Sequence, residues 1–179
     1  KATIQTASQF NEPSICIWEN VSNSLYYREK PEGCIVNVSI DNDKIIISDN
    51  SEGMDTKILK SFFTLGGENL ARKNEQAAWN KRGEFGEGGL AAFGIADTLT
   101  VESVKDGKRN IFRLTRDALV NCGDLDSEVP LDELKVNEET KDPNGTVITI
   151  SEINVKRINS ERVIRKISRE ISKLENPTV

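Results

Sequence analysis

The sequence predicts an α+β fold, a two-layer sandwich in which a mostly antiparallel sheet carries helices on one face. Short β-branched segments come in pairs joined by turn residues, and amphipathic segments with helical spacing lie between and after these pairs. The size agrees, because 179 residues with a 36% hydrophobic fraction suffice for one domain with a sizeable core. Since the chain opens on Lys1 rather than Met, we expect residues 1–179 to be a single domain of a longer protein.

The first half of the chain predicts a helix, a hairpin and a second, short helix. Residues 14–27 have apolar side chains at helical spacing. Residues 34–40 alternate as a strand does, and 41–43 (Asp-Asn-Asp) are turn residues. Residues 44–48 complete the hairpin as a strand that we expect to be buried on both faces, and 56–63 predict the short helix.

The second half predicts another hairpin, one more strand and a closing helix. An Asp-Gly turn joins strands at residues 98–103 and 110–115, and residues 144–153 form the further strand. Residues 160–176 predict an amphipathic helix. Its apolar stripe consists of Val163, Ile167, Ile171 and Leu174. Residues 117–142 are acidic and irregular and predict no element.

The composition excludes several classes of protein. There is no histidine, which removes Ser-His-Asp and Cys-His catalysis. The cysteines, Cys16, Cys34 and Cys122, form no Cys-x-x-Cys pair, so we expect reduced thiols in a cytoplasmic protein and no zinc site. No apolar run is long enough to span a membrane. The net charge of −5 argues against this domain wrapping a nucleic-acid backbone by itself.

The stretch "KRGEFGEGGLAAFGIAD" at residues 81–97 has four glycines between Gly83 and Gly89 and then continues into an apolar segment that predicts a helix. Its order, GxxGxG, differs from the dinucleotide fingerprint, and it lacks the Lys-Ser/Thr ending of a P-loop. Glycines nevertheless let a backbone approach an anion closely, and free N–H groups at a helix start favour negative charge. The alternative is a flexible hinge without a ligand.

Glu19 and Asn23 are the first of three further candidate groups. On a helix their i, i+4 spacing places both side chains on one face. A carboxylate next to an amide carbonyl suits a general base beside a magnesium ligand. The alternative is a solvated polar face.

The other two groups stand at strand ends. Asp49 follows a buried strand, where a carboxylate can bind a ligand, and Gly53-Met54 offer close backbone approach and an apolar wall. An Asn-Gly-Thr sequence ending at Thr146 opens a later strand. Taken singly, each has an ordinary turn as its alternative.

The order Glu-x3-Asn, Asp-x3-Gly, GxxGxG and Gly-Thr resembles a known family, the GHKL (Bergerat-fold) ATPases. This superfamily includes gyrase B subunits, the 90-kDa heat-shock chaperones, histidine kinases and MutL. The resemblance covers essentially the whole chain, and the glycine-rich stretch looks closest to the MutL-like and MORC-like branch.

The resemblance implies the chemistry of the site. It makes Glu19 the general base that activates the attacking water, and Asn23 the ligand of a Mg²⁺ ion on the triphosphate of ATP. It makes Asp49 the acceptor for the adenine amino group. Other residues contact the nucleotide. They are Gly53 and Met54 along the base, Thr146 near the adenine, and Gly83, Gly86, Gly88 and Gly89 as N–H donors to phosphate. Residues 55–82 become the ATP lid.

The resemblance also implies how the domain works. Its nucleotide state drives lid closure and an ATP-dependent homodimer, and hydrolysis is slow or absent without a downstream transducer domain. Contact with nucleic acid is implied only through domains outside this sequence. Two alternatives are a histidine-kinase-type phosphotransfer domain and a non-hydrolysing nucleotide sensor.

Two positions depart from the family pattern. Tyr26 stands where an aspartate usually supports the metal-binding helix, and Ser51 replaces a glycine after Asp49. If position 51 requires a positive φ, we expect Ser51 to cost about 1 kcal/mol of strain.

Overall fold

The computed structural model describes residues 12–26, 33–41, 43–63, 88–121 and 129–175. Within these ranges six strands form one sheet in the order β1-β2-β6-β3-β4-β5, and each neighbouring pair is antiparallel. The strands are β1 (Val36–Ile40), β2 (Lys44–Asp49), β3 (Ala96–Lys105), β4 (Lys108–Thr115), β5 (Asp132–Glu139) and β6 (Gly145–Ile153). The helices are α2 (Pro13–Tyr26), α3 (Thr56–Phe62), the 3₁₀ helix η3 (Gly88–Gly94), α4 (Arg116–Asn121) and α5 (Ser160–Glu175). The predicted α+β fold is confirmed.

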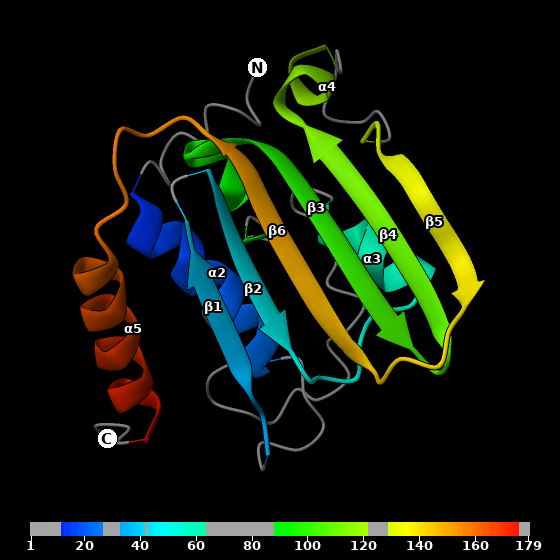
Figure 1. Cartoon of the computed structure of the whole chain (residues 1–179), viewed down its shortest axis with the longest axis horizontal. Helices are drawn as coiled ribbons and strands as arrows, with labels where there is room; N and C mark the ends of the chain where they lie inside the picture. The colour runs from blue at the N-terminus through cyan, green and yellow to red at the C-terminus, as the bar shows by residue number, and fades with distance from the viewer. Residues whose placement is uncertain (1–11, 27–32, 42, 64–87, 122–128, 176–179) are drawn as a thin grey trace.

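The helices form the second layer. Figure 1 shows α2 and α3 behind the sheet, α5 beside the β1 edge, and α4 at the end of β4. Helix α5 packs against α2, and η3 packs against both α2 and β3. In the described part of the chain, the opposite face of the sheet has no helix over its centre (Figure 1).

The core lies between the sheet and these helices. Strand alternation turns Ile47, Val101 and Phe112 toward the helices, and each is at most 1% exposed. The strand register sets these three and Ile148 side by side in one apolar row. The prediction that residues 44–48 are buried on both faces is wrong, because Ile46 points to the open face and is only half-buried.

The second hairpin forms at the predicted turn. Asp106 and Gly107 have φ values of 51° and 74°, so both occupy the left-handed region that a two-residue hairpin loop requires. The flanking strands pair through eight residues each, from Lys105 opposite Lys108 to Thr98 opposite Thr115.

The acidic stretch 117–142, for which no element was predicted, contains most of α4 and all of β5. Strand β5 escaped prediction because it is an edge strand with little buried apolar surface. Its two apolar side chains, Leu134 and Val136, are 50% and 43% exposed. Register shifts against β4 also interrupt its alternation. Charged side chains and bulges are common on edges, where they prevent pairing with other chains.

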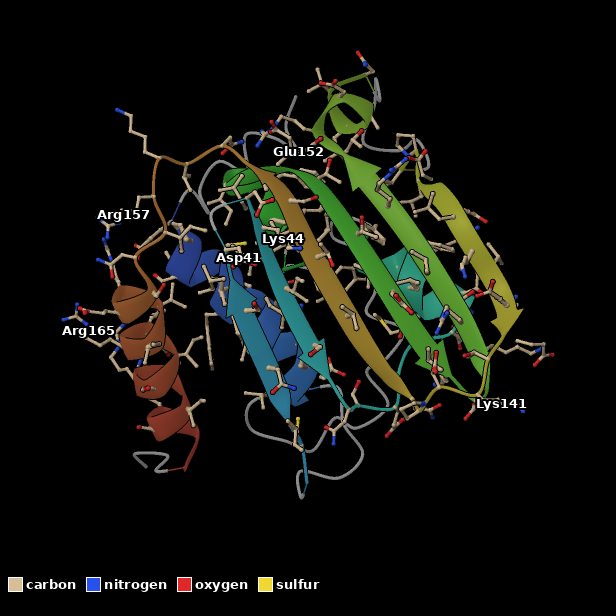
Figure 2. The ribbon with its side chains drawn as sticks, viewed as in Figure 1. Asp41, Lys44, Lys141, Glu152, Arg157 and Arg165 are labelled. Atoms are coloured by element: carbon tan, nitrogen blue, oxygen red, sulfur yellow. The ribbon has the colours of Figure 1, made fainter. Side chains whose placement is uncertain are left out.

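Two further elements follow the glycines and close the chain. The helix expected after the glycines is a 3₁₀ helix of seven residues, with Leu90 to Phe93 buried on all sides. The closing helix α5 forms as predicted, and Val163 of its apolar stripe is 2% exposed. Figure 2 shows Arg165 projecting from its outer side, and Arg157 on the segment just before it. Among the described residues, no helix is both long and apolar enough to cross a membrane.

Candidate functional site

Asp49 lies at the end of β2, where α2 and the first residues of β6 meet. Its Oδ2 accepts a hydrogen bond of 2.6 Å from the Ser24 hydroxyl of α2. Its Oδ1 accepts from the backbone N–H of Ser51 at 3.0 Å and of Thr146 at 3.2 Å. A carboxylate offers about four acceptor positions. One position is therefore left on a half-buried, firmly held carboxylate, and this position suits a donor on a ligand.

Helix α2 carries the two polar residues of the Glu-x3-Asn motif. Pro13 stands in the first turn, where its missing N–H costs nothing, and Ile17 and Val21 turn into the core. Glu19 and Asn23 occupy a half-buried flank of the helix, one turn apart. Because Asn23 directly precedes Ser24, the hydrogen bond to Asp49 holds this flank close to the end of β2.

The Cys16 thiol lies on the buried face of α2. Burial and, second, the negative charge of Glu19 raise the pKa of the Cys16 thiol well above its usual range. Cys16 therefore stays protonated and acts as a small core residue rather than a nucleophile. Next to it, the Asn20 side chain is fully buried and donates to the Cys16 carbonyl at 2.9 Å. The Asn20 Oδ1 has no partner in the described part of the chain.

The loop after β2 runs tightly along the end of β3. Gly53 has a φ of 73°, and a Cβ added there would lie 1.9 Å from the Val104 carbonyl oxygen. Met54 donates its backbone N–H to the Ser103 hydroxyl at 2.7 Å. Ser51 has no positive φ, so the strain expected for this position does not arise. Instead its N–H donates to Asp49.

The start of β6 lies equally close to the end of β2. A Cβ added to Gly145 would lie 2.4 Å from the carbonyl oxygen of Asp49, so any side chain there would displace that residue. Thr146 is 5% exposed, and its hydroxyl lies 3.0 Å from the Ser103 hydroxyl. The Asn-Gly-Thr sequence is therefore more than a turn, because it packs directly against the candidate carboxylate.

The structure brings some of the predicted site residues together and leaves others undescribed. Asp49, Gly53, Met54 and Thr146 meet at one end of the sheet, with Asn23 and Glu19 on the adjoining helix. Gly88 and Gly89 open η3, which packs against α2. Gly83, Gly86 and residues 64–82 of the predicted lid lie outside the described residues. The first part of that lid is α3, and its Leu59 is buried in the core.

Sequence reasoning missed Ser24, Ser103 and Asn110. Ser103 and Asn110 are buried and polar at positions where strand alternation points to the core. A hydroxyl or amide at such a position was the available signal, because a buried polar group requires a partner.

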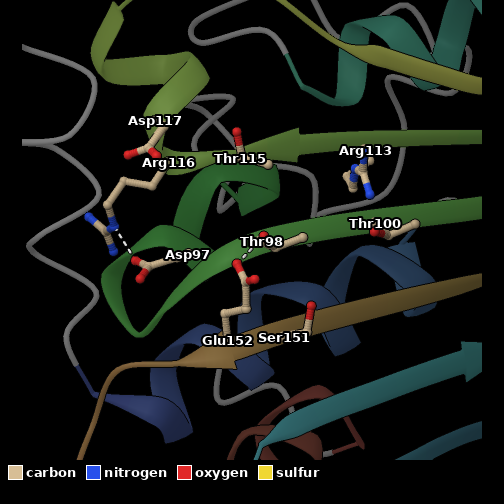
Figure 3. Close-up of a pocket in the computed structure, with 9 residues that line it drawn as sticks. All are labelled: Asp97, Thr98, Thr100, Arg113, Thr115, Arg116, Asp117, Ser151 and Glu152. Atoms are coloured by element: carbon tan, nitrogen blue, oxygen red, sulfur yellow. Dashed lines mark hydrogen bonds and ion pairs between the residues drawn. The ribbon is translucent and has the colours of Figure 1, made fainter.

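A separate hollow of about 750 Å³ lies on the open face at the opposite end of the sheet (Figure 3). The register pairs Thr98 with Ser151 there, whereas Ser103 and Thr146 pair at the end that holds Asp49. Several of its charges are engaged within the protein. Arg116 pairs with Asp97 and donates to the Ala96 carbonyl at 2.9 Å, and Thr98 donates to Glu152 at 2.6 Å. Arg116 also donates to the Phe93 carbonyl, so it fastens the end of η3 and the start of β3 to α4.

Within the described residues, no three acidic or thiol side chains gather as a metal site of their own. A Mg²⁺ ion bound mainly through nucleotide phosphates and water requires only one or two protein ligands. The amide oxygen of Asn23 beside the Glu19 carboxylate is a donor set of this kind.

Comparison with known proteins finds a family whose model matches most of the chain. The sequence model of the family described as histidine kinase-, DNA gyrase B-, and HSP90-like ATPase matches residues 12–146, about three quarters of the chain. This range begins just before α2 and ends at Thr146, so it includes every predicted site residue. No curated protein matches the sequence.

Proposed function

Because the chain belongs to the family of histidine kinase-, DNA gyrase B-, and HSP90-like ATPases, we propose that it is an ATP-binding domain that hydrolyses ATP with Mg²⁺. The observation behind this proposal is the carboxylate of Asp49, which keeps one acceptor position beside Gly53 and Thr146. The exocyclic amino group of adenine is a donor and fits this position. The oxygen that guanine has there is an acceptor and would be repelled.

Two residues of α2 supply the groups for hydrolysis. The Glu19 carboxylate accepts a proton from the attacking water, and the Asn23 amide oxygen holds the metal. Mg²⁺, when bound, neutralises charge on the phosphates. The glycines from Gly83 to Gly89 supply N–H donors for the triphosphate. Since phosphoryl transfer depends chiefly on positioning and charge stabilisation, this set of groups suffices.

Hydrolysis is favoured over transfer to a protein side chain because a carboxylate is present at position 19. A general base is needed to deprotonate water. The phosphotransfer domain remains the alternative, and a phosphorylated partner would indicate it. A sensor that binds ATP without turnover is the third candidate.

The proposal extends to the movement of the domain. ATP closes the lid at residues 55–82 and promotes a homodimer of the full-length cytoplasmic protein. Because α3 is anchored in the core through Leu59 and Phe63, we expect residues 56–63 to stay with the core when the lid closes. A downstream transducer domain completes the catalytic site, so the isolated domain turns over slowly or not at all.

Calorimetric titration of the protein with ATP and Mg²⁺ tests the proposal. We expect Asp49→Asn to lose ATP binding, because the amide can no longer accept all of its present hydrogen bonds and that of the base. Asp41→Asn, the same change at the exposed start of the β1–β2 turn, is the matched control and binds ATP normally. Glu19→Ala in the full-length protein keeps binding and loses turnover. Wild-type protein that shows no ATP binding, or Glu19→Ala protein with normal turnover, contradicts the proposal.

A further inference from the structure

A row of buried polar side chains crosses the sheet at the level of Asp49. The register sets Asp49 opposite Thr146, Thr146 opposite Ser103, and Ser103 opposite Asn110. The last three are 5%, 0% and 1% exposed. Two residues further along each strand lies the apolar row of Ile47, Ile148, Val101 and Phe112. Burying polar groups is unfavourable unless they are hydrogen-bonded, so this row requires specific partners.

The partner of Ser103 is the loop that follows Asp49. The Ser103 hydroxyl accepts the Met54 N–H at 2.7 Å and lies 3.2 Å from the Gly145 carbonyl and 3.0 Å from the Thr146 hydroxyl. Because the carbonyl only accepts, all groups are satisfied when Ser103 donates to Gly145 and Thr146 donates to Ser103. Ser103 thus fixes both the loop and the direction of the Thr146 hydroxyl.

The partner of Asn110 is the start of α3. Its Oδ1 accepts from the Thr56 hydroxyl at 3.0 Å and from the Asn137 N–H at 2.8 Å. Asn137 has a φ of 50° where β5 shifts register against β4, so its N–H turns inward to Asn110. The loop from Ser51 to Thr56 is therefore held at two points, by β3 at Met54 and by β4 at Thr56.

The two residues that flank Met54 are also held in place. Gly53 lies so close to the Val104 carbonyl that no side chain fits between them. Asp55 caps α3 through its Oδ1, which accepts from the Ile58 N–H at 2.8 Å. Any change at Met54 or Thr56 is thus transmitted to Gly53, the closest approach of the loop to β3.

From these contacts we propose that Ser103 and Asn110 are positioning residues of the nucleotide site, which hold Gly53 and Met54 at the edge of the adenine pocket. This inference rests on the proposed function. Neither residue touches the nucleotide. They act on affinity for the base, through the loop and the Thr146 hydroxyl, and not on phosphate contacts.

Ser103→Ala and Asn110→Ala, each measured by calorimetry at a temperature where the variant is fully folded, test this inference. We expect the Kd for ATP to rise about tenfold in Ser103→Ala, and the Kd values for ADP and adenosine to rise by the same factor. Ser103→Thr keeps the hydroxyl and restores affinity. Ser151→Ala, a change of the same chemistry on the open face of β6, leaves all three Kd values unchanged. Hydrogen exchange of the Met54 amide becomes faster in Ser103→Ala even without nucleotide.

The outcomes separate the two proposals. Wild-type protein that binds no ATP overturns the proposed function and this inference with it. Wild-type protein that binds ATP, together with folded Ser103→Ala and Asn110→Ala proteins that bind all three ligands as tightly, overturns this inference alone. Unchanged Met54 exchange in Ser103→Ala also overturns it, even if the variant is less stable.

Discussion

Replacing Gly53 with alanine separates the cost of a left-handed backbone from the cost of a steric clash. Gly53 and Gly107 have nearly equal φ values of 73° and 74°, so an alanine pays the same conformational penalty, about 1–2 kcal/mol, at either position. At Gly107 the new Cβ would lie 3.6 Å from the Thr140 carbonyl oxygen, an ordinary contact. At Gly53 it would lie 1.9 Å from one Val104 backbone atom and 2.7 Å from another.

The clash at Gly53 cannot be relieved by rotating a side chain. Both Val104 atoms belong to the backbone of β3, which pairs with β6 on one side and β4 on the other. The loop must therefore move by about an ångström, as in overpacked cores, where such strain costs a further 1–3 kcal/mol. We expect Gly53→Ala to lose roughly 2–5 kcal/mol of unfolding free energy and Gly107→Ala only about 1–2 kcal/mol.

Urea denaturation measures the unfolding free energies, and calorimetry measures the Kd for ATP. The displaced loop also pulls Met54 from Ser103, so the Kd of folded Gly53→Ala protein rises at least tenfold, whereas that of Gly107→Ala is unchanged. Gly33→Ala, at a φ of 82° with no atom within 4 Å of the new Cβ, is a second control. Gly53→Ala protein that is no less stable than Gly107→Ala and binds ATP equally well refutes the reasoning.

Two further predictions concern α2 and α5. Ser24→Ala removes the 2.6 Å hydrogen bond to Asp49, and calorimetry should show ATP affinity lower by about 1–2 kcal/mol. In the control Ser22→Ala, the lost hydroxyl donates to the Glu19 carbonyl, so ATP affinity stays as in wild type. Equal ATP affinities of Ser24→Ala and wild type contradict the prediction. Burial alone would raise the pKa of Glu170, but hydrogen bonds and charge from Lys173 and Lys166 outweigh it and lower the pKa from 4.5 to about 2. A depressed carboxyl pKa contributes stability that is complete above about pH 4.5 and is lost as the pH falls toward 2. The stability gap between wild type and Glu170→Gln, measured by urea denaturation, should therefore close over that window; a constant gap from pH 7 to pH 2 would refute the assignment.

The sequence predicted those parts of the fold that depend on local patterns. The Asp-Gly turn and the alternating strands around it formed as expected, because left-handed φ preference and period-two burial are properties of neighbouring residues. The apolar stripe of α5 likewise packs against the core, where its Val163 is buried. Strand β5 was missed because an edge strand is held by backbone pairing to β4 and leaves its side chains in solvent, so its composition resembles that of a loop.

The candidate site was predictable only in part for the same reason. Asp49, Gly53 and Thr146 belong to short motifs that can be recognised within a few residues of chain. The partners that hold them cannot be recognised in this way, because Ser24 meets Asp49 across 25 residues and Met54 meets Ser103 across 49. A serine in a strand cannot be recognised as part of a site until the strand register shows which other polar groups lie next to it.

The hydrogen bond between Ser24 and Asp49 links the two halves of the proposed chemistry. An α-helix turns by about 100° per residue, so the Ser24 hydrogen bond and the buried Ile17 and Val21 together fix the direction of the other side chains on α2. Asn23 and Glu19 then lie about 40° apart on the adjoining flank, one turn along the axis from each other. Helix α2 carries Glu19, proposed to activate water, and is bonded through Ser24 to Asp49, proposed to select adenine. One rigid helix thus fixes the position of Glu19 relative to Asp49. A shift in Asp49 that rotated α2 by even one residue would move Glu19 off this flank, so base recognition and hydrolysis should fail together when Asp49 is displaced.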